Sequence, residues 1–271
     1  MVIYFKSSTC NIINTKIGLI IALIFLLSSC KPHQKAIIIG EPNYRSHSHN
    51  DYRHKRPLYD ALENGISSVE IDIYRFAGKL WVCHWPTGII RFRKIQDWYL
   101  EPIRKILNSK DGFIYKKGEP FYIMIEMKTK TKRTFPLLKK VLAQYKDILT
   151  TYSNDSIFQK PIVVSILGNK DDDYWLKDSL RFYGIELSIN YACDSLNPYL
   201  YTQFRMHAGS PNNLSTQYYI NAIECAHKQH RRIRANAGED IEYNWKALLI
   251  SGIDFIHTDD LIGVNKFLKN R

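Results

Sequence analysis

Hydrophobic and polar positions follow two alternating periods from residue 44 to the C-terminus. Short apolar runs predict buried strands, and residues 121–127 form the most continuous run. Apolar residues three and four apart predict helices, as in 136–149. By the same criteria, further strands are expected at 67–74, 79–84, 161–167, 184–188, 232–237 and 254–257, and further helices at 171–182, 214–230, 242–250 and 261–268.

The repeated strand-then-helix order predicts an α/β fold with a parallel sheet. Periodicity does not separate an open doubly wound sheet from a closed barrel. Polar residues at the ends of several successive strands favour a single (β/α)8 TIM-type barrel, whose site is built by the C-terminal ends of its strands. No Gly-x-Gly-x-x-Gly follows the first strand, which disfavours dinucleotide binding. We expect any irregular or missing element to lie within 162–231.

The N-terminal segment has the pattern of a secretion signal. An apolar run of 11 residues, 17–27, follows Lys6 and Lys16. A run of this length is too short to cross a hydrocarbon core of about 30 Å as a helix. It ends in Leu-Ser-Ser-Cys at 27–30, which resembles the lipobox of bacterial lipoproteins.

This resemblance implies a signal peptide at 1–29, a lipid on Cys30, a tether at 30–43 and a catalytic domain at 44–271. It also implies a lipid-anchored membrane protein of a bacterial cell envelope, facing the periplasm or the cell surface. The alternative is an ordinary signal peptide that ends near a cysteine.

Composition narrows the classes of function. The chain has 271 residues, 45% of them hydrophobic and 24% charged, as in a folded single domain. Its net charge of +12 raises the local concentration of anionic partners such as phosphate esters and acidic lipids, although the same charge also serves colloidal stability alone. No Lys/Arg-rich block with interleaved aromatic residues occurs, so no nucleic-acid partner is expected. No protein partner is inferred.

Three cysteines follow Cys30. Cys83, Cys193 and Cys225 are widely spaced and form no Cys-x-x-Cys pair. This spacing argues against a disulfide framework and against a zinc site. We therefore expect the three thiols to be free, small residues of the core.

Three polar clusters carry the candidate chemistry. Glu70 and Asp72 are two apart in a strand, so both carboxylates lie on one face. Glu126 ends an apolar strand and offers a third carboxylate, with Lys128 two residues further on. Unpaired carboxylates at a barrel mouth repel each other, and a bound divalent cation, Ca²⁺ or Mg²⁺, resolves the repulsion.

Two histidines, His49 and His84, flank these carboxylates in the sequence. A metal, a general base and a general acid are the groups that in-line displacement at phosphorus requires. His47 is expected to be a solvated neighbour of the site or a residue that supports a site residue from behind, and a rival base is the further alternative. Side chains expected only to cap the loop or line the pocket are those of Asp51, Tyr52, His207, Asn236 and His257.

The motifs His-Asn-Asp-Tyr at 49–52, Glu-Ile-Asp at 70–72, His84 and Glu-Met-Lys at 126–128 resemble the superfamily of phospholipase-C-like phosphodiesterases. This superfamily includes glycerophosphodiester phosphodiesterases and phosphatidylinositol-specific phospholipases C. The Lys-Arg-Pro-Leu stretch and the following Asp-Ala-Leu, together 55–62, are similar to the altered inheritance of mitochondria protein group.

The resemblance implies roles for individual residues. His49 and His84 would be the acid/base pair, and Lys128 would contact the phosphate, although an ion pair with Glu126 is the alternative. The implied metal ligands are Asn50, Glu70, Asp72 and Glu126. Many glycerophosphodiesterases have His-Arg where this chain has His-Asn, which leaves the substrate subfamily open.

The expected function is therefore metal-dependent cleavage of a phosphodiester in a glycerophosphodiester or phosphatidylinositol-like substrate. The partners implied are this substrate or lipid head group, and a membrane through the lipid anchor. A hydrolase and a cyclising lyase both use this machinery and stay open. The alternative class is a non-catalytic surface lipoprotein that binds anionic lipids or polymers.

Overall fold

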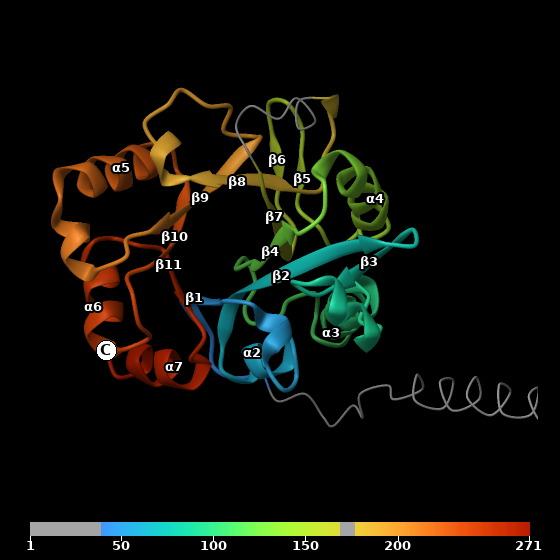
Figure 1. Cartoon of the computed structure of the whole chain (residues 1–271), viewed down its shortest axis with the longest axis horizontal. Coiled ribbons are helices and arrows are strands. Elements are labelled where there is room, and N and C mark those ends of the chain that lie inside the picture. The colour runs from blue at the N-terminus through green and yellow to red at the C-terminus, as the bar shows by residue number, and fades with distance from the viewer. Residues whose placement is uncertain (1–38, 169–176) are drawn as a thin grey trace, which may run out of the picture. The chain divides into compact units, whose positions relative to one another are not determined.

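The computed structural model describes residues 39–168 and 177–271. These residues form a closed barrel of eight parallel strands with helices outside (Figure 1), so the predicted TIM-type fold is confirmed. The barrel strands, in spatial order, are β1 (Asn43–Ser48), β11 (Phe255–Thr258), β10 (Arg232–Asn236), β9 (Tyr201–His207), β8 (Gly184–Ser188), β7 (Ile162–Leu167), β4 (Phe121–Met127) and β2 (Ile66–Phe76), and β2 pairs with β1 to close the ring.

Three strands lie outside this ring. The strand β3 (Lys79–Val82) pairs antiparallel with the long β2, and His84, two residues after its end, bonds to Asp72 of β2. The short strands β5 (Thr151–Tyr152) and β6 (Ile157–Phe158) form a separate antiparallel pair.

Helices follow most of the barrel strands. The α-helices are α2 (Tyr59–Glu63), α3 (Glu101–Ser109), α4 (Thr131–Ala143), α5 (Gln217–Lys228), α6 (Glu242–Ile250) and α7 (Leu261–Lys269). Shorter 3-10 or π turns are η1 (Asp51–Arg53), η2 (Pro86–Arg91), η3 (Gln96–Leu100), η5 (Ile189–Tyr191) and η6 (Pro211–Ser215).

The structure departs from the predicted elements mainly in the middle of the chain. The connection from β8 to β9 has only the turn η5 in place of a helix, as expected for an irregular region. The strand β9 was missed, and helix α4 begins at Thr131 rather than at 136. Half of the helix expected at 171–182, residues 171–176, lies outside the described residues, and Arg181 is in an extended bridge.

The alternation of β2 explains how a barrel strand carries charge into the interior. Val69, Ile71 and Ile73 are fully buried on the helix side. Ser68, Glu70 and Asp72 lie on the opposite face and are also buried. Both faces of the strand are therefore covered, and its carboxylates lie inside the barrel, as the sequence predicted.

The cysteine prediction is wrong in one respect. Cys193 and Cys225 form a disulfide with a Cα–Cα distance of 5.0 Å, which joins the η5 region to helix α5. The sequence separation of 32 residues gives no local pattern, so only the fold reveals that the two thiols meet. Cys83 is free and buried, as expected.

Candidate active site

Three carboxylates from two neighbouring strands form a cluster at the C-terminal ends of the barrel strands. The parallel register pairs Asp72 of β2 with Glu126 of β4. Ligand atoms of Glu70, Asp72 and Glu126 all lie within 4.8 Å of one another. The structure thus brings together the three carboxylates that the sequence selected. Their spacing suits oxygen coordination of one hard divalent cation.

The hydrogen bonds of Asp72 involve only one of its two carboxylate oxygens. Its Oδ2 atom accepts bonds from Tyr52 and His84, whereas its buried Oδ1 atom has no hydrogen-bond partner. A buried carboxylate oxygen without a partner is costly. Burial raises the pKa of Asp72 despite these bonds. The donor set and the unpartnered oxygen therefore fit a divalent cation held by Glu70, Asp72 and Glu126.

Lys128 lies at the edge of this cluster. Its Nζ atom is 2.6 Å from Glu126 Oε1 and 3.4 Å from Asp72 Oδ2. The ion pair with Glu126 that the sequence left open as an alternative is therefore present. The lysine side chain is partly buried.

His84 is oriented by Asp72. The Nδ1–H group donates to Asp72 Oδ2 at 2.7 Å, because a carboxylate can only accept. The other ring nitrogen, Nε2, is then the basic atom of the neutral ring. The hydroxyl of Tyr52 donates to the same Asp72 oxygen at 2.7 Å. Tyr52 therefore contacts the site instead of only packing the loop.

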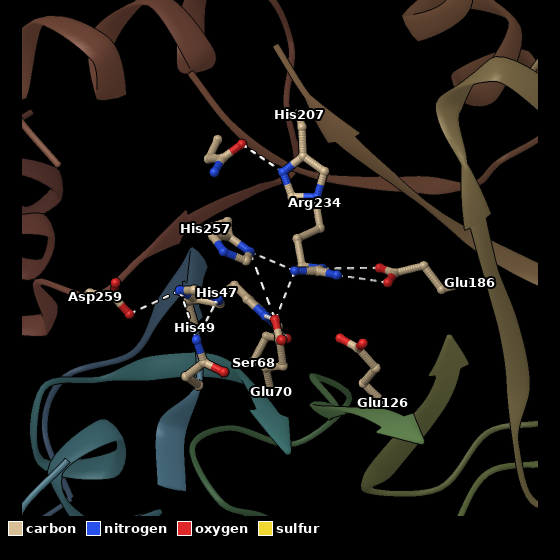
Figure 2. Close-up of polar contacts among 12 residues, drawn as sticks. His47, His49, Ser68, Glu70, Glu126, Glu186, His207, Arg234, His257 and Asp259 are labelled. Atoms are coloured by element: carbon tan, nitrogen blue, oxygen red, sulfur yellow. Dashed lines mark hydrogen bonds and ion pairs between the residues drawn. The ribbon is translucent and has the colours of Figure 1, made fainter. Parts of the chain in front are cut away.

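His49 is oriented by a carboxylate at the end of the neighbouring strand, because β1 pairs with β11. Its Nδ1 lies 3.0 Å from Asp259 Oδ1 (Figure 2). Burial lowers the pKa of His49, but the bond to Asp259 and the charge of Glu70 raise it above its ordinary value. Asn50 Nδ2 donates to His49 Nε2 at 2.7 Å.

The loop that carries His49 is held in an unusual backbone conformation. Asn50 has φ 45°, in the left-handed region that asparagine tolerates better than most residues. Asp51 fixes the loop, because its buried carboxylate accepts from Ser48, Tyr99 and the Leu58 backbone. Asn50 Oδ1 accepts from Tyr52 at 2.6 Å, so the predicted metal ligand is linked to the carboxylate cluster through Tyr52.

Arg234 lies between several of the site's side chains and was not predicted from the sequence. Figure 2 shows its guanidinium between Glu186 on one side and Glu70 and His257 on the other. It donates to Glu186 through Nε (3.1 Å) and Nη2 (2.8 Å), and to Glu70 through Nη1 (3.0 Å). Burial would raise the pKa of Glu70, but Arg234 and the nearby histidines hold it at about 2.

The signal for Arg234 was present in the sequence. In β10 the polar residues Arg232, Arg234 and Asn236 alternate with Ile233 and Ala235. This is the same period-two rule that selected Glu70 and Asp72. Gln203 and Glu186 lie on the neighbouring inward faces and are bonded to each other at 2.6 Å.

A group of histidine rings surrounds His257. Its ring centroid lies 4.1 Å from that of His49, 5.4 Å from His47 and 6.1 Å from His207. Arg234 Nη1 donates to His257 Nδ1 at 2.5 Å. Burial and then Arg234 lower the pKa of His257 well below its ordinary value, so this ring is neutral.

The expectation that His47 is solvated is wrong. The residue is fully buried, with Nδ1 2.7 Å from Ser68 Oγ and Nε2 3.5 Å from Glu70. Burial lowers the pKa of His47 to about 4 against the opposing effect of Glu70. Its side chain supports Glu70 from inside the barrel, and this burial disfavours it as a rival base.

These observations define an α/β barrel whose mouth carries a carboxylate cluster between two carboxylate-oriented histidines. Residues 42–181 match the model of the AIM6-like phosphodiesterase domain, and this match spans just over half of the chain. The chain belongs to this family, as the sequence resemblance implied. The match supports a phosphoric diester hydrolase.

Two curated proteins are similar to the chain. It is 26% identical to altered inheritance of mitochondria protein 6 of Eremothecium gossypii over 88% of this chain and 74% of that protein. It is 26% identical to the protein 6 homolog of Arthroderma benhamiae over 50% of this chain, and spans 53% of that relative. The chain thus spans about half the length of the second protein.

A solved structure shares the fold. The glycerophosphodiester phosphodiesterase of Agrobacterium tumefaciens superimposes with a TM-score of 0.52 at 15% identity, covering 82% of this chain and 100% of that one. At this low sequence identity, the structural likeness shows the barrel fold alone.

The expected localisation in a bacterial envelope is wrong, because the curated relatives are fungal proteins named for altered inheritance of mitochondria. Residues 1–29, Cys30 and most of the expected tether lie outside the described residues. The last residues of the expected tether belong to the barrel, because Asn43 begins β1 and the Gly40 backbone N–H donates to the Leu62 carbonyl oxygen. Within 39–168 and 177–271, no helix has the length and apolar content needed to cross a membrane.

Proposed function

We propose that this chain is a metal-dependent phosphodiesterase that cleaves glycerophosphodiester or phosphatidylinositol-like substrates, with His49 and His84 as the acid/base pair. The observation that carries the proposal is the bonding of Asp72. One oxygen of this carboxylate orients His84, and the other is buried without a partner beside two more carboxylates. General acid/base chemistry and cation binding therefore share one residue.

The two histidines have matching arrangements. Each has its Nδ1 atom on a carboxylate, Asp259 for His49 and Asp72 for His84. The proton on Nδ1 leaves Nε2 as the basic atom of each ring, and substrate would replace the Asn50 amide at His49 Nε2. One imidazole removes the proton from the attacking oxygen, which is that of water in a hydrolase and of a substrate hydroxyl in a lyase. The other imidazole protonates the oxygen of the leaving alcohol.

The charged groups of the site suit a phosphate. Lys128, beside Glu126 and Asp72, would contact a non-bridging phosphoryl oxygen. Glu70, Asp72 and Glu126, with Asn50 as a further candidate, would hold one divalent cation, Ca²⁺ or Mg²⁺. When bound, this cation supplies positive charge that stabilises the developing charge on the phosphoryl oxygens.

The test uses the purified full chain with glycerophosphocholine, glycerophosphoinositol and phosphatidylinositol, each with Ca²⁺, Mg²⁺ or EDTA. Phosphorus NMR separates a phosphate monoester, the product of a hydrolase, from a cyclic phosphate, the product of a lyase. Cleavage that requires metal supports the proposal. The absence of turnover on all three substrates, with metal still bound in calorimetry, would favour a non-catalytic module that binds anionic polymers or lipids.

A further inference from the structure

A cavity lies beside His84. Its volume is about 300 Å³, and its lining includes Tyr52 and His84, which both bond to Asp72, and three arginines, Arg53, Arg91 and Arg93. The cavity is therefore continuous with the candidate active site on the β3 side of the barrel mouth. Neither the acid/base pair nor the carboxylate cluster uses these arginines.

The three arginines have no carboxylate partner. None of them forms an ion pair with a residue of the described chain. By contrast, Arg56, in the same loop as Arg53, pairs with both Asp60 and Glu63. The sequence between Asp72 and Asp97 contains no acidic residue. Positive charge therefore gathers around this cavity without an internal counter-ion.

The fold holds two of these arginines close together although they repel each other. Burial and then the charge of Arg91 lower the pKa of Arg93. Arg93 is fixed from two sides: it donates to the Tyr52 carbonyl oxygen at 2.9 Å, and it stacks on the Trp98 ring at 4.2 Å. A fixed guanidinium group without a carboxylate partner, like that of Arg93, suits the binding of a phosphate.

The cavity wall is closely packed on the end of β3. A Cβ atom on Gly88 would come within 2.5 Å of the Cys83 Cβ atom, so only glycine permits this close packing of η2 on the strand end. Phe92, between Arg91 and Arg93, has a left-handed φ of 50° that is costly for a residue with a side chain. The exposed Trp85 ring lies 4.8 Å from the His84 ring and forms an apolar wall.

We propose that this cavity is a subsite for a second anionic group of the substrate, a phosphate monoester carried by the alcohol part of the phosphodiester. The inference rests on the proposed function of the adjacent site and specifies its substrate class. The guanidinium groups of Arg53, Arg91 and Arg93 bind the phosphate monoester, and Trp85 packs against the ring or chain that carries it. Substrates with this second phosphate are preferred over those without it.

The first test compares kcat/KM for glycerophosphoinositol 4-phosphate and for glycerophosphoinositol. Loss of one charge-assisted hydrogen bond to phosphate weakens binding about tenfold or more. We expect wild type to prefer the phosphorylated substrate at least about tenfold, and Arg91→Gln to lose about tenfold of that preference. Lys269→Gln removes the same charge at the far end of helix α7 and should keep the preference. An equal rate for both substrates in wild type would overturn the subsite, as would an undiminished preference in Arg91→Gln.

A binding experiment separates this inference from the proposed function. Calorimetry with the full chain compares inositol 1,4-bisphosphate with inositol 1-phosphate. If no diester is turned over, but the bisphosphate binds about tenfold more tightly and Arg91→Gln removes the difference, the proposed function fails and the subsite stands. If diesters are turned over but the two probes bind equally, the subsite fails and the proposed function stands.

A third arm identifies the source of the phosphate. The same comparison is made with phosphatidylinositol 4-phosphate and phosphatidylinositol in vesicles. A preference that is larger in vesicles than with the deacylated pair supports a lipid head group as the ligand, and an equal preference in both forms supports a soluble diester. No preference in either form overturns the subsite.

Discussion

The two halves of the barrel mouth carry different kinds of groups. The half formed by β1 to β4 supplies the carboxylates, His49 and His84, and lies within the residues that match the family model. The half formed by β8 to β11 supplies the buried Arg234 and the ring of His257. The second half therefore stabilises the acidic half, because Arg234 pairs with Glu70 and lowers the pKa of this carboxylate.

The comparison predicts that the largest catalytic losses come from the first half. Replacement of His84 or His49 by Ala should lower kcat about 10²–10⁴-fold, the usual contribution of a general acid or base. The measurement is turnover of the diester that wild type cleaves best. His227→Ala is a matched control, because His227 also pairs with an aspartate at 3.0 Å but lies on helix α5. Wild-type rates in either active-site variant would exclude the acid/base assignment.

Replacement of Arg234 tests the second half. Arg234→Met leaves Glu186 and Glu70 buried without their cation, which costs about 3–5 kcal/mol of unfolding free energy. Urea unfolding followed by circular dichroism measures this loss. A matched control is Arg56→Met, which removes an exposed arginine that also contacts two carboxylates and should cost at most about 1 kcal/mol. Equal losses of unfolding free energy in the two variants would mean that the buried ion pairs of Arg234 contribute no more to stability than the exposed ion pairs of Arg56.

Sequence reasoning succeeded where one strand contains its own signal. The alternation in β2 and the polar end of β4 were sufficient to select Glu70, Asp72 and Glu126, because neighbouring parallel strands bring these positions together. It failed where the signal is a relation between distant segments. Asp259 contacts His49 across 210 residues, and Cys193 meets Cys225 only because η5 packs on α5.

The site also contains residues that the sequence could have yielded but did not. Arg234 and Glu186 follow the same period-two pattern as Glu70, yet the strands that carry them fall in or beside the region without a recognisable motif. The burial of His47 has another cause. A histidine beside a polar loop reads as solvated, and only the closure of β1 against β2 and β11 covers it.

The bond between the halves at His49 gives an intermediate effect. The carboxylate of Asp259 orients His49 and raises the pKa of this histidine, and Asp259→Asn removes its charge. Loss of such a supporting carboxylate typically costs about 10–100-fold in activity. We expect this fall in kcat with an unchanged KM, because Asp259 acts through His49. Asp254→Asn, which affects the His227 pair, is the matched control. A rise in KM at constant kcat would instead indicate that Asp259 contacts substrate.

The smallest effect should come from a bond within the first half. Tyr52→Phe removes the hydroxyl that lies 2.7 Å from Asp72 Oδ2 and 2.6 Å from Asn50 Oδ1, and whose single proton serves one of these two oxygens. Asp72 Oδ2 keeps its bond to His84 and its proximity to Lys128, so no buried charge is left alone. The expected loss of unfolding free energy is therefore about 1 kcal/mol, the net value of one hydrogen bond. A loss as large as that of Arg234→Met would show that the first half depends on its own hydrogen bonds as strongly as on Arg234, and would remove the asymmetry between the halves.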